Sequence, residues 1–377
     1  MRFRLWTGRI LVLKTLYVKL ARRRYPILVG QGLIADAGKL VAAKTGWDSP
    51  PIVITNSTVR RLHGPELLEA LRRVFGRVPV LSIGDGERFK NHETLLKIYR
   101  GMFREQANRR SWILAFGGGV IGDIAGFAAA TFMRGIPYVM VPTTLLAQVD
   151  SSIGGKVGIN MSQGKNLIGA FHQPSAVLSD TDTLKTLPKR ELAAGIYEVI
   201  KCGAIRSEPL LGYLEQNLPG ILRCQARETV HIVLEAARIK AEVVARDEKE
   251  TGLRMILNYG HTVGHAFEAA TDYRRFKHGE AIAWGMMAAV EYGRELGYLR
   301  PEEAARLLRI IRSVSPLPTL RGISGTDLWN ALVRDKKFGT GDIRLVLLRK
   351  LGTAEICPGV DPSSLRRFLK KFLVSNL

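Results

Sequence analysis

Short apolar runs alternate with amphipathic stretches over the first half of the chain. The runs are bounded by turn residues and have the length of buried strands. They lie at Thr15–Leu20, Tyr25–Gly30, Pro51–Thr55, Val78–Ile83, Trp112–Phe116 and Tyr138–Val141. Between them, His92–Glu105 and Val120–Phe132 have helical spacing. A succession of strand, helix and strand is typical of a parallel sheet with crossover helices.

The pattern changes after Leu187 and Pro188. Long amphipathic stretches of helical spacing then dominate, at Arg190–Ile205, Arg227–Glu248, His261–Ala270, Gly279–Leu296 and Pro301–Ser313. The run Arg344–Leu348 is the main strand-like exception. We therefore predict an α/β, Rossmann-like N-terminal domain over residues 1–187 and a mostly α-helical C-terminal domain over residues 188–377.

Composition narrows the class of protein. A chain of 377 residues is long enough for two domains. Its three cysteines include no C-x-x-C pair, which argues against a disulfide framework and a cysteine zinc site and favours a reducing, cytoplasmic location. No run approaches the roughly 18 apolar residues of a membrane span, so we expect no membrane partner.

The chain is strongly basic, with a net charge of +22. Eight Lys or Arg precede Asp36, the first acid, and such a segment is also typical of a transit peptide; the two strand-like runs within it favour a folded segment. The other basic residues are scattered, without an aromatic-interleaved stripe. We therefore expect a surface that attracts small anions rather than a nucleic-acid partner.

A glycine-rich turn, Gly117–Asp123, follows the Trp112–Phe116 run and opens a helix. It satisfies G-x-G-x-x-G, in which glycines let the backbone approach a pyrophosphate and the helix N-terminus supplies N–H groups. No acid ends a strand about twenty residues later, as the usual dinucleotide fingerprint requires. The motif indicates a nucleotide but leaves open a tight turn without a ligand.

Histidines and carboxylates form the strongest chemical signal. His261 and His265 are four residues apart, so a helix presents both rings on one side. His278 precedes another predicted helix, and Glu198 is an acid within an apolar helical run. Three nitrogen or oxygen ligands with an open position are typical of a catalytic metal site. Any one of these histidines alone is more often a hydrogen-bonded core residue.

Other polar residues recur near these motifs. Glu250, Arg254 and Asn258 repeat every four residues and, if helical, form one polar line; a solvated ion-pair ladder is the alternative. Lysines beside glycines in predicted turns have the character of a phosphate or carboxylate pocket, although each lysine alone would be an ordinary surface charge. They are Lys90, Lys156 and Lys165.

The motifs together resemble the 3-dehydroquinate synthases. The resemblance rests on GGGVIGDIAGFAAATFMRGIPYVMVPTTLLAQVDSSIGGKVGIN, GKNLIGAFHQP, DTDTLKTLP, EVIK, HGEA, DKK and the spacing E-x3-R-x3-N-x-G-H-x2-G-H, and it covers about Lys14 to Leu351. It implies a dehydroquinate synthase-like fold, bound NAD, and one divalent metal, Zn²⁺ or Co²⁺. It also implies conversion of 3-deoxy-D-arabino-heptulosonate 7-phosphate to 3-dehydroquinate and phosphate.

The resemblance further implies roles for matching positions. The implied metal ligands are Glu198, His261 and His278. The implied cofactor contacts are Gly118, Gly119, Val120, Asp123, Thr143, Thr144, Lys156 and Lys165 and, more loosely, Glu87, Lys90 and Thr183. The implied substrate contacts are Asp150, Lys156, Lys165, Asn166, Lys201, Lys240, Arg254, Asn258 and His265, with one of Lys336 and Lys337. The implied catalytic groups are Lys156, Lys201, Glu250, Arg254, Asn258 and His265. Arg134 matches an arginine that members of the family contribute to the active site of the neighbouring subunit, which implies a homodimer.

Two related classes of enzyme remain as alternatives. Sister sugar phosphate cyclases, which make inosose or valiolone skeletons, commonly have an acid at the position of Asn258, so Asn258 favours dehydroquinate. A metal-dependent polyol dehydrogenase would release NADH and would not need so many lysines directed at phosphate. Tyr197 departs from the small residue common in the family, and we expect it to narrow the metal pocket.

Overall fold

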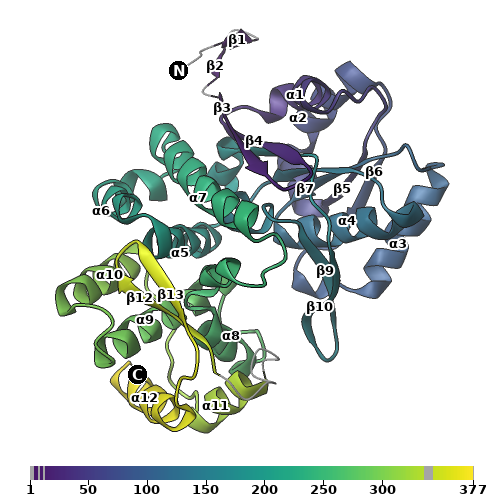
Figure 1. Cartoon of the computed structure of the whole chain (residues 1–377). Helices are drawn as coiled ribbons and strands as arrows, with labels where there is room; N and C mark the ends of the chain where they lie inside the picture. The colour runs from purple at the N-terminus through teal and green to yellow at the C-terminus, as the bar shows by residue number, and fades with distance from the viewer. Residues whose placement is uncertain (1–3, 7–8, 12, 335–342, 377) are drawn as a thin grey trace. The chain divides into compact units, whose positions relative to one another are not determined.

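The structure is a computed structural model that describes residues 4–6, 9–11, 13–334 and 343–376. The chain divides into two compact units (Figure 1). Unit 1 comprises residues 1–187 and 223–249, and unit 2 comprises residues 188–222 and 250–377. The first division therefore lies where the sequence pattern changes, but residues 223–249 return to unit 1 instead of continuing the C-terminal domain.

The described part of unit 1 contains a seven-stranded sheet in the order β3-β4-β11-β8-β7-β5-β6. Strand β3 is antiparallel to β4, and the other pairs are parallel. The strands are β3 (Leu13–Lys19), β4 (Arg24–Gly30), β5 (Ile52–Asn56), β6 (Val80–Ile83), β7 (Ile113–Gly117), β8 (Tyr138–Pro142) and β11 (Ala176–Asp180). Strands β7, β8 and β11 are buried along their whole length, as apolar runs in a parallel sheet require.

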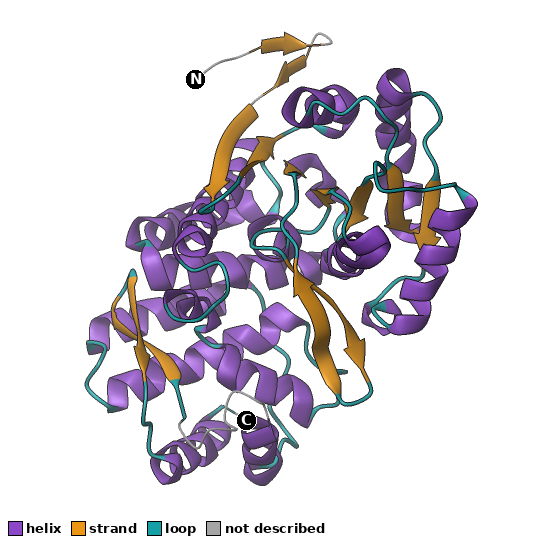
Figure 2. Ribbon diagram, turned by 45° about the vertical axis from the view of Figure 1, so that its right-hand side comes forward, coloured by secondary structure: helices purple, strands orange, loops and turns teal. Residues whose placement is uncertain are grey.

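Helices join successive strands of this sheet and cover it (Figure 2). They are α1 (Ala37–Thr45), α2 (Ser57–Phe75), α3 (His92–Arg104) and α4 (Gly119–Thr131). The core between helices and sheet includes Leu28, Val53 and Leu114. Since β6 and β7 lie on opposite sides of β5, the order in which strands are added to the sheet reverses there, and in such sheets ligands bind beyond the carboxyl ends of the strands.

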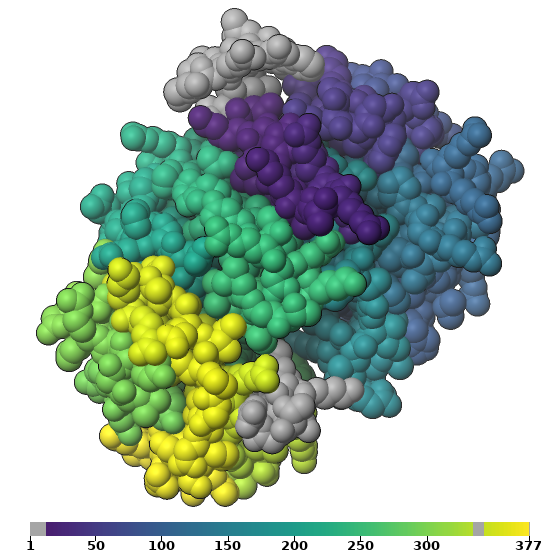
Figure 3. All heavy atoms as spheres, viewed as in Figure 1, coloured from purple at the N-terminus to yellow at the C-terminus, as the bar shows by residue number. Residues whose placement is uncertain are grey.

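Two features of unit 1 differ from the sequence-based expectation. Residues expected in turns form the antiparallel hairpin β9 (Lys156–Met161) and β10 (Gly164–Phe171). Pairing between the two strands orders these residues, and local composition does not reveal such pairing. Helix α7 (Ala226–Arg246) packs against β3 and the π-helical turn η4 (Ala147–Ser151). Figures 1 and 3 show α7, in green, beside the purple N-terminal strands. This packing places α7 in unit 1.

Unit 2 is mostly helical, which confirms the predicted fold class. Its helices are α5 (Lys189–Arg206), α6 (Glu208–Leu222), α8 (His261–Ala270), α9 (His278–Glu295), α10 (Pro301–Val314), α11 (Gly325–Arg334) and α12 (Pro362–Ser375). Strands β12 (Leu345–Lys350) and β13 (Thr353–Cys357) form a hairpin. Helix α5 is buried from Leu192 to Ile205 and is the central helix of the unit.

Three further observations concern the described chain. A separate short hairpin, β1 (Arg4–Trp6) and β2 (Arg9–Leu11), precedes β3. Cys202, Cys224 and Cys357 are free thiols and buried. Within the described residues, no helix combines the length and the apolar character needed to cross a membrane.

Candidate active-site residues

The glycine turn of unit 1 is tightly packed around its backbone. A Cβ at Gly118 would lie 3.0 Å from the Thr144 side chain, and one at Gly119 would lie 3.1 Å from Ser151 Oγ. The Thr143 amide donates to the Gly117 carbonyl at 3.0 Å, which ties the end of β8 to the end of β7. Helix α4 begins at Gly119, so its first N–H groups point out of the turn, as an anion-binding helix N-terminus requires.

Lys90 connects the first turns of α4 to the hairpin β9–β10. Its ammonium group is buried and contacts the carboxylate of Asp123 and the side-chain oxygen of Asn166. Burial raises the pKa of Asp123, and the positive charge of Lys90 opposes that rise. Asn160 accepts from the Asn166 amide at 2.9 Å and donates to Glu87 at 2.7 Å. The sequence pattern had separated these five residues among three motifs, and the structure joins them in one network.

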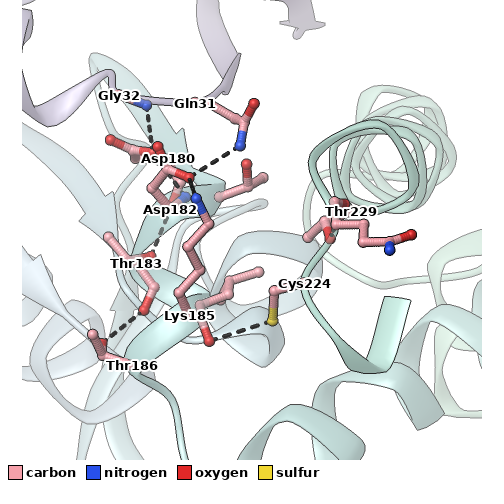
Figure 4. Close-up of polar contacts among 12 residues, drawn as sticks. Gln31, Gly32, Asp180, Asp182, Thr183, Lys185, Thr186, Cys224 and Thr229 are labelled. Carbon is pink, nitrogen blue, oxygen red and sulfur yellow. Dashed lines mark hydrogen bonds and ion pairs between the residues drawn. The ribbon is translucent and has the colours of Figure 1, made fainter. Parts of the chain in front are cut away.

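Three more residues singled out in the sequence have hydrogen-bond partners in unit 1. The Lys240 ammonium group donates to Asp150 Oδ1 at 2.5 Å and to its carbonyl at 2.8 Å. Thr183 is buried and donates to the Asp180 carbonyl at 2.7 Å (Figure 4). Gln148, which the motifs did not indicate, donates to the same carbonyl at 2.9 Å. Gln148 also donates to the Pro142 carbonyl at 3.2 Å, so its side chain links the ends of β8 and β11.

The histidine motif of unit 2 meets Glu198, although their positions are 63 and 80 residues apart in the chain. His261 Nε2 and His278 Nε2 lie 3.8 and 3.7 Å from Glu198 Oε1. Glu198 Oε2 lies 2.5 Å from Lys201 Nζ, and both side chains are 1% exposed. Among the described residues, Glu198 Oε1 accepts no hydrogen bond, whereas Oε2 is paired with the Lys201 ammonium group. A buried carboxylate oxygen without a donor, facing two imidazole nitrogens, fits a bound cation.

The donor set fits a divalent metal ion of the zinc type. Ligand atoms about 2.0–2.2 Å from a tetrahedral ion are roughly 3.3–3.6 Å apart, close to the separations between Glu198 Oε1 and the two imidazole nitrogens. His261, His265 and His278 also bring ligand atoms within 4.8 Å of one another. Glu198, His261 and His278 could therefore hold the ion, with His265 beside them.

Glycines allow the three helices that carry these groups to approach one another. A Cβ at Gly279 of α9 would lie 2.0 Å from the Ala194 carbonyl oxygen of α5. A Cβ at Gly285 would lie 1.9 Å from the Gly260 carbonyl oxygen, and one at Gly264 would lie 2.9 Å from that of Ala281. Real side chains do not occupy such space. The glycines of the sequence motifs are therefore needed for the convergence of Glu198, His261 and His278.

The polar line upstream of His261 is not an α-helix. Glu250 lies outside any helix, with a positive φ of 60°, and Leu253–Asn258 forms the 3-10 helix η6. The Asn258 side-chain amide nevertheless donates to Glu250 Oε1 at 2.8 Å. Arg254, which lies between these two residues in the sequence, is buried. The α-helix on which the predicted polar line depended is thus not formed, since a 3-10 helix has three residues per turn and Glu250 lies before it.

The remaining expectations have simple outcomes. The buried Tyr197 has its hydroxyl 3.3 Å from the carbonyl and from Oγ of Ser315, and adjacent helical residues point about 100° apart, so its hydroxyl is directed away from Glu198. Lys156 and Lys165 belong to β9 and β10. Lys336 and Lys337 lie outside the described residues. Val120 lies in the first turn of α4.

Sequence reasoning overlooked two residues that contact these groups. Asn160 carries no local signal of its own in the sequence, because its network forms only through the cross-strand pairing of the hairpin β9–β10. Glu268 lies seven residues after His261 on α8, and its Oε2 is 3.2 Å from His278 Nδ1. The seven-residue spacing places His261 and Glu268 on one face of a helix and could have indicated Glu268.

Solved structures define the class first. A 2-epi-5-epi-valiolone synthase from Streptomyces hygroscopicus, solved with NAD⁺ and Zn²⁺, is 27% identical and superposes with a TM-score of 0.84 over 93% of this chain and 97% of its own. A 2-deoxy-scyllo-inosose synthase, solved with carbaglucose-6-phosphate, NAD⁺ and Co²⁺, is 25% identical, with a TM-score of 0.82 over 97% and 100%. The chain has the fold of the sugar phosphate cyclases.

Sequence comparison defines the family within that class. The family model 3-dehydroquinate synthase N-terminal matches residues 80–194, and the model 3-dehydroquinate synthase C-terminal matches residues 195–338. A curated 3-dehydroquinate synthase from Pelotomaculum thermopropionicum is 45% identical over 358 residues, which are 95% of this chain and 96% of the relative. The chain belongs to the 3-dehydroquinate synthase family of enzymes.

Proposed function

We propose that the protein converts 3-deoxy-D-arabino-heptulosonate 7-phosphate to 3-dehydroquinate and inorganic phosphate. The family membership supports the reaction, since the nearly full-length relative is a 3-dehydroquinate synthase. The observation that carries the proposal is the buried Glu198 carboxylate, whose Oε1 lies within 4 Å of Nε2 of both His261 and His278. That arrangement supports a catalytic divalent metal, Zn²⁺ or Co²⁺.

The proposed cofactor is NAD, which the glycine turn and the N-terminus of α4 would bind. The proposed contacts come from the turn, from the Lys90 network and from the ends of the strands: Glu87, Lys90, Gly118, Gly119, Val120, Asp123, Thr143, Thr144, Lys156, Lys165 and Thr183. Bound at Glu198, His261 and His278, the metal ion would supply polarisation of a substrate hydroxyl, and NAD would supply reversible hydride transfer at the carbon that carries this hydroxyl.

The chain's own residues bind the anionic substrate and move protons. Oxidation of the substrate hydroxyl to a ketone acidifies the adjacent C–H, and loss of that proton expels phosphate as the carbon–oxygen bond breaks. Reduction of the ketone, opening of the ring and an intramolecular aldol step then form the carbocycle. We propose His265, beside the metal ligands, as a carrier of these protons. The proposed substrate contacts are Asp150, Lys156, Lys165, Asn166, Lys201, Lys240, Arg254, Asn258 and His265, with Glu250 orienting Asn258.

We also propose that the protein is a homodimer in which the guanidinium group of Arg134 contacts the substrate bound by the partner subunit. Met133 and Arg134 both have positive φ, 51° and 69°, a conformation that costs energy for side chains of this kind and is often retained at functional positions. Large apolar side chains are exposed on the same unit and would be covered by a second copy: Leu96, Phe103, Leu167, Ile168 and Phe171. The three free, buried cysteines are consistent with a proposed cytoplasmic location.

A single assay tests the reaction. The purified protein is incubated with the heptulosonate phosphate, NAD and Zn²⁺, and released phosphate and NADH are both followed. We expect one phosphate per substrate without accumulation of NADH, because the hydride returns within each turnover. Accumulating NADH would indicate a polyol dehydrogenase instead. Turnover only after another sugar phosphate is supplied would indicate a sister cyclase. Protein treated with a chelator is the control and should recover activity when Zn²⁺ is restored.

A further inference from the structure

The two histidines that approach Glu198 do so with the same ring nitrogen. Nε2 of His261 and Nε2 of His278 face Glu198 Oε1. Their other nitrogens have separate neighbours: His261 Nδ1 lies 3.2 Å from the Tyr259 carbonyl oxygen, and His278 Nδ1 lies 3.2 Å from Glu268 Oε2. Both outer neighbours are hydrogen-bond acceptors. Each ring is therefore paired with an acceptor on the side away from Glu198.

We propose that Glu268 is a positioning residue for the metal ligand His278. Its carboxylate accepts a hydrogen bond from Nδ1–H of His278, which fixes the tautomer whose unprotonated Nε2 points toward Glu198 and the metal ion. The inference rests on the proposed function, since it requires a metal at this position. A carboxylate behind a metal-bound histidine orients the ring and makes it a stronger ligand, and its loss typically lowers metal affinity about 10- to 100-fold.

Other groups already hold the backbone around His278, whereas Glu268 contacts the imidazole ring of this residue. The Lys277 amide donates to Glu280 Oε2 at 2.7 Å at the first turn of α9. Arg190 of α5 binds the same Glu280 carboxylate through Nε and Nη2, at 2.6 and 2.7 Å. These contacts fix the start of the helix without Glu268. The carboxylate of Glu268 therefore acts on the orientation of the imidazole rather than on the position of α9.

The two histidines also differ in how much they need such support. The side chain of His278 is 33% exposed, whereas that of His261 is 10% exposed. A ring at the surface has more freedom to rotate, so it loses more conformational entropy when it binds a metal. The Glu268 side chain is 5% exposed, and a buried carboxylate requires a polar partner. A buried side-chain acceptor thus restrains the more exposed ring, while a backbone carbonyl suffices for the buried one.

The test measures metal affinity directly, in the full-length protein. Metal-free wild type, Glu268→Gln and Glu268→Ala are titrated with Zn²⁺ in competition with a chromophoric chelator. We expect Glu268→Ala to bind about 10- to 100-fold more weakly than wild type. Glu268→Gln keeps an acceptor oxygen and should recover part of the loss. With Co²⁺ as the ion, the visible absorption of both variants should shift, because the geometry of the His278 ligand changes.

Controls separate this inference from the proposed function and from a structural role. Glu291→Gln, a half-buried change on α9, should leave the affinity unchanged. If both Glu268 variants bind Zn²⁺ within twofold of wild type, the inference is wrong, even when the thermal unfolding temperature of the metal-free protein falls. If Glu268→Ala does not fold, Glu268→Leu, which keeps the bulk of the side chain without an acceptor, decides by the same twofold limit. A wild type that binds no metal would instead contradict the proposed function.

Discussion

Gly279 of α9 lies directly against the backbone of Ala194 on α5, where a Cβ at Gly279 would be 2.0 Å from the Ala194 carbonyl oxygen. Ala194 is one helical turn before Glu198, and Gly279 follows His278 in the chain. This single backbone contact therefore sets the distance between the carboxylate and the imidazole that would share the metal. The H-G-E motif needs its glycine for packing as much as its histidine for chemistry.

Replacing this glycine should separate the two helices. We expect Gly279→Ala to lower the free energy of unfolding by about 1–3 kcal/mol, the usual cost of overpacking, and to weaken Zn²⁺ binding. Urea unfolding and the metal titration measure the two effects. Gly212→Ala on α6 is the matched control, because a Cβ there meets only the end of the Arg306 side chain, 3.7 Å away. Wild-type metal affinity in Gly279→Ala would show that the α5–α9 contact does not set the ligand geometry.

Removing a proposed ligand should remove the metal. Glu198→Gln keeps the size of the side chain but loses its charge, and it also leaves the buried Lys201 without its carboxylate partner. We expect Glu198→Gln and His261→Ala both to lose bound metal on gel filtration and to release no phosphate from the substrate. Full activity in His261→Ala would contradict the proposed ligand set. The metal content of each folded variant, measured by elemental analysis, is compared with that of wild type.

The network around Lys90 should determine how well NAD and substrate bind. Asn160→Ala removes the acceptor for the Asn166 amide and the donor to Glu87. Loss of hydrogen bonds of this kind costs about 1–3 kcal/mol, so we expect the KM values for NAD and substrate to rise about tenfold, with a smaller change in kcat. Gln163→Ala, an exposed change at the tip of the same hairpin, should behave like wild type. Unchanged KM values in Asn160→Ala would exclude a positioning role for the network.

Asp180 should make the stability of the protein depend on pH. Its carboxylate accepts from the backbone amides of Gly32, Ile34 and Asp182, as Figure 4 shows for Gly32 and Asp182. Burial nevertheless raises the pKa of Asp180 to about 6. Since the folded protein holds this proton more tightly than the unfolded chain, the group's contribution to stability is fully present below about pH 4 and is lost as the pH rises through 6.

Asp180→Asn removes this titration. The rise of about two pKa units corresponds to roughly 3 kcal/mol, so the variant should gain about that much stability relative to wild type between about pH 4 and pH 7. Urea unfolding across this range gives the difference, and the exposed Asp48→Asn is the control. A stability difference between Asp180→Asn and wild type that does not change with pH would contradict the raised pKa.

Arg134 should act across the proposed dimer. If its guanidinium serves the partner's substrate, Arg134→Ala and His261→Ala are each inactive alone. A mixed dimer, however, contains one site with both groups. Random exchange of subunits should then restore about a quarter of wild-type activity, as expected for a symmetric dimer. Activity is measured before and after mild unfolding and refolding of the mixture. No recovery, with mixed dimers demonstrated by a tag on one variant, would place Arg134 at its own subunit's site.

Local sequence patterns were sufficient for several features. The apolar runs gave β5, β7 and β8, since buried parallel strands are continuous in hydrophobic character. The glycine turn opens α4 where the motif indicated. The four-residue spacing of His261 and His265 was correctly assigned to a helix, α8. All of these depend on residues close together in the chain, where period and turn chemistry act.

Contacts between distant segments were decided only by the tertiary structure. The pattern identified α7 as a helix, but its packing on β3 assigned it to unit 1, and Lys240 thereby meets Asp150, 90 residues earlier. The sequence marked Glu198, His261 and His278 as separate candidates, while the glycine contacts of α5, α8 and α9 bring them together. Periodicity reports which face of an element is buried but not which element covers it, because that choice depends on the packing of the whole chain.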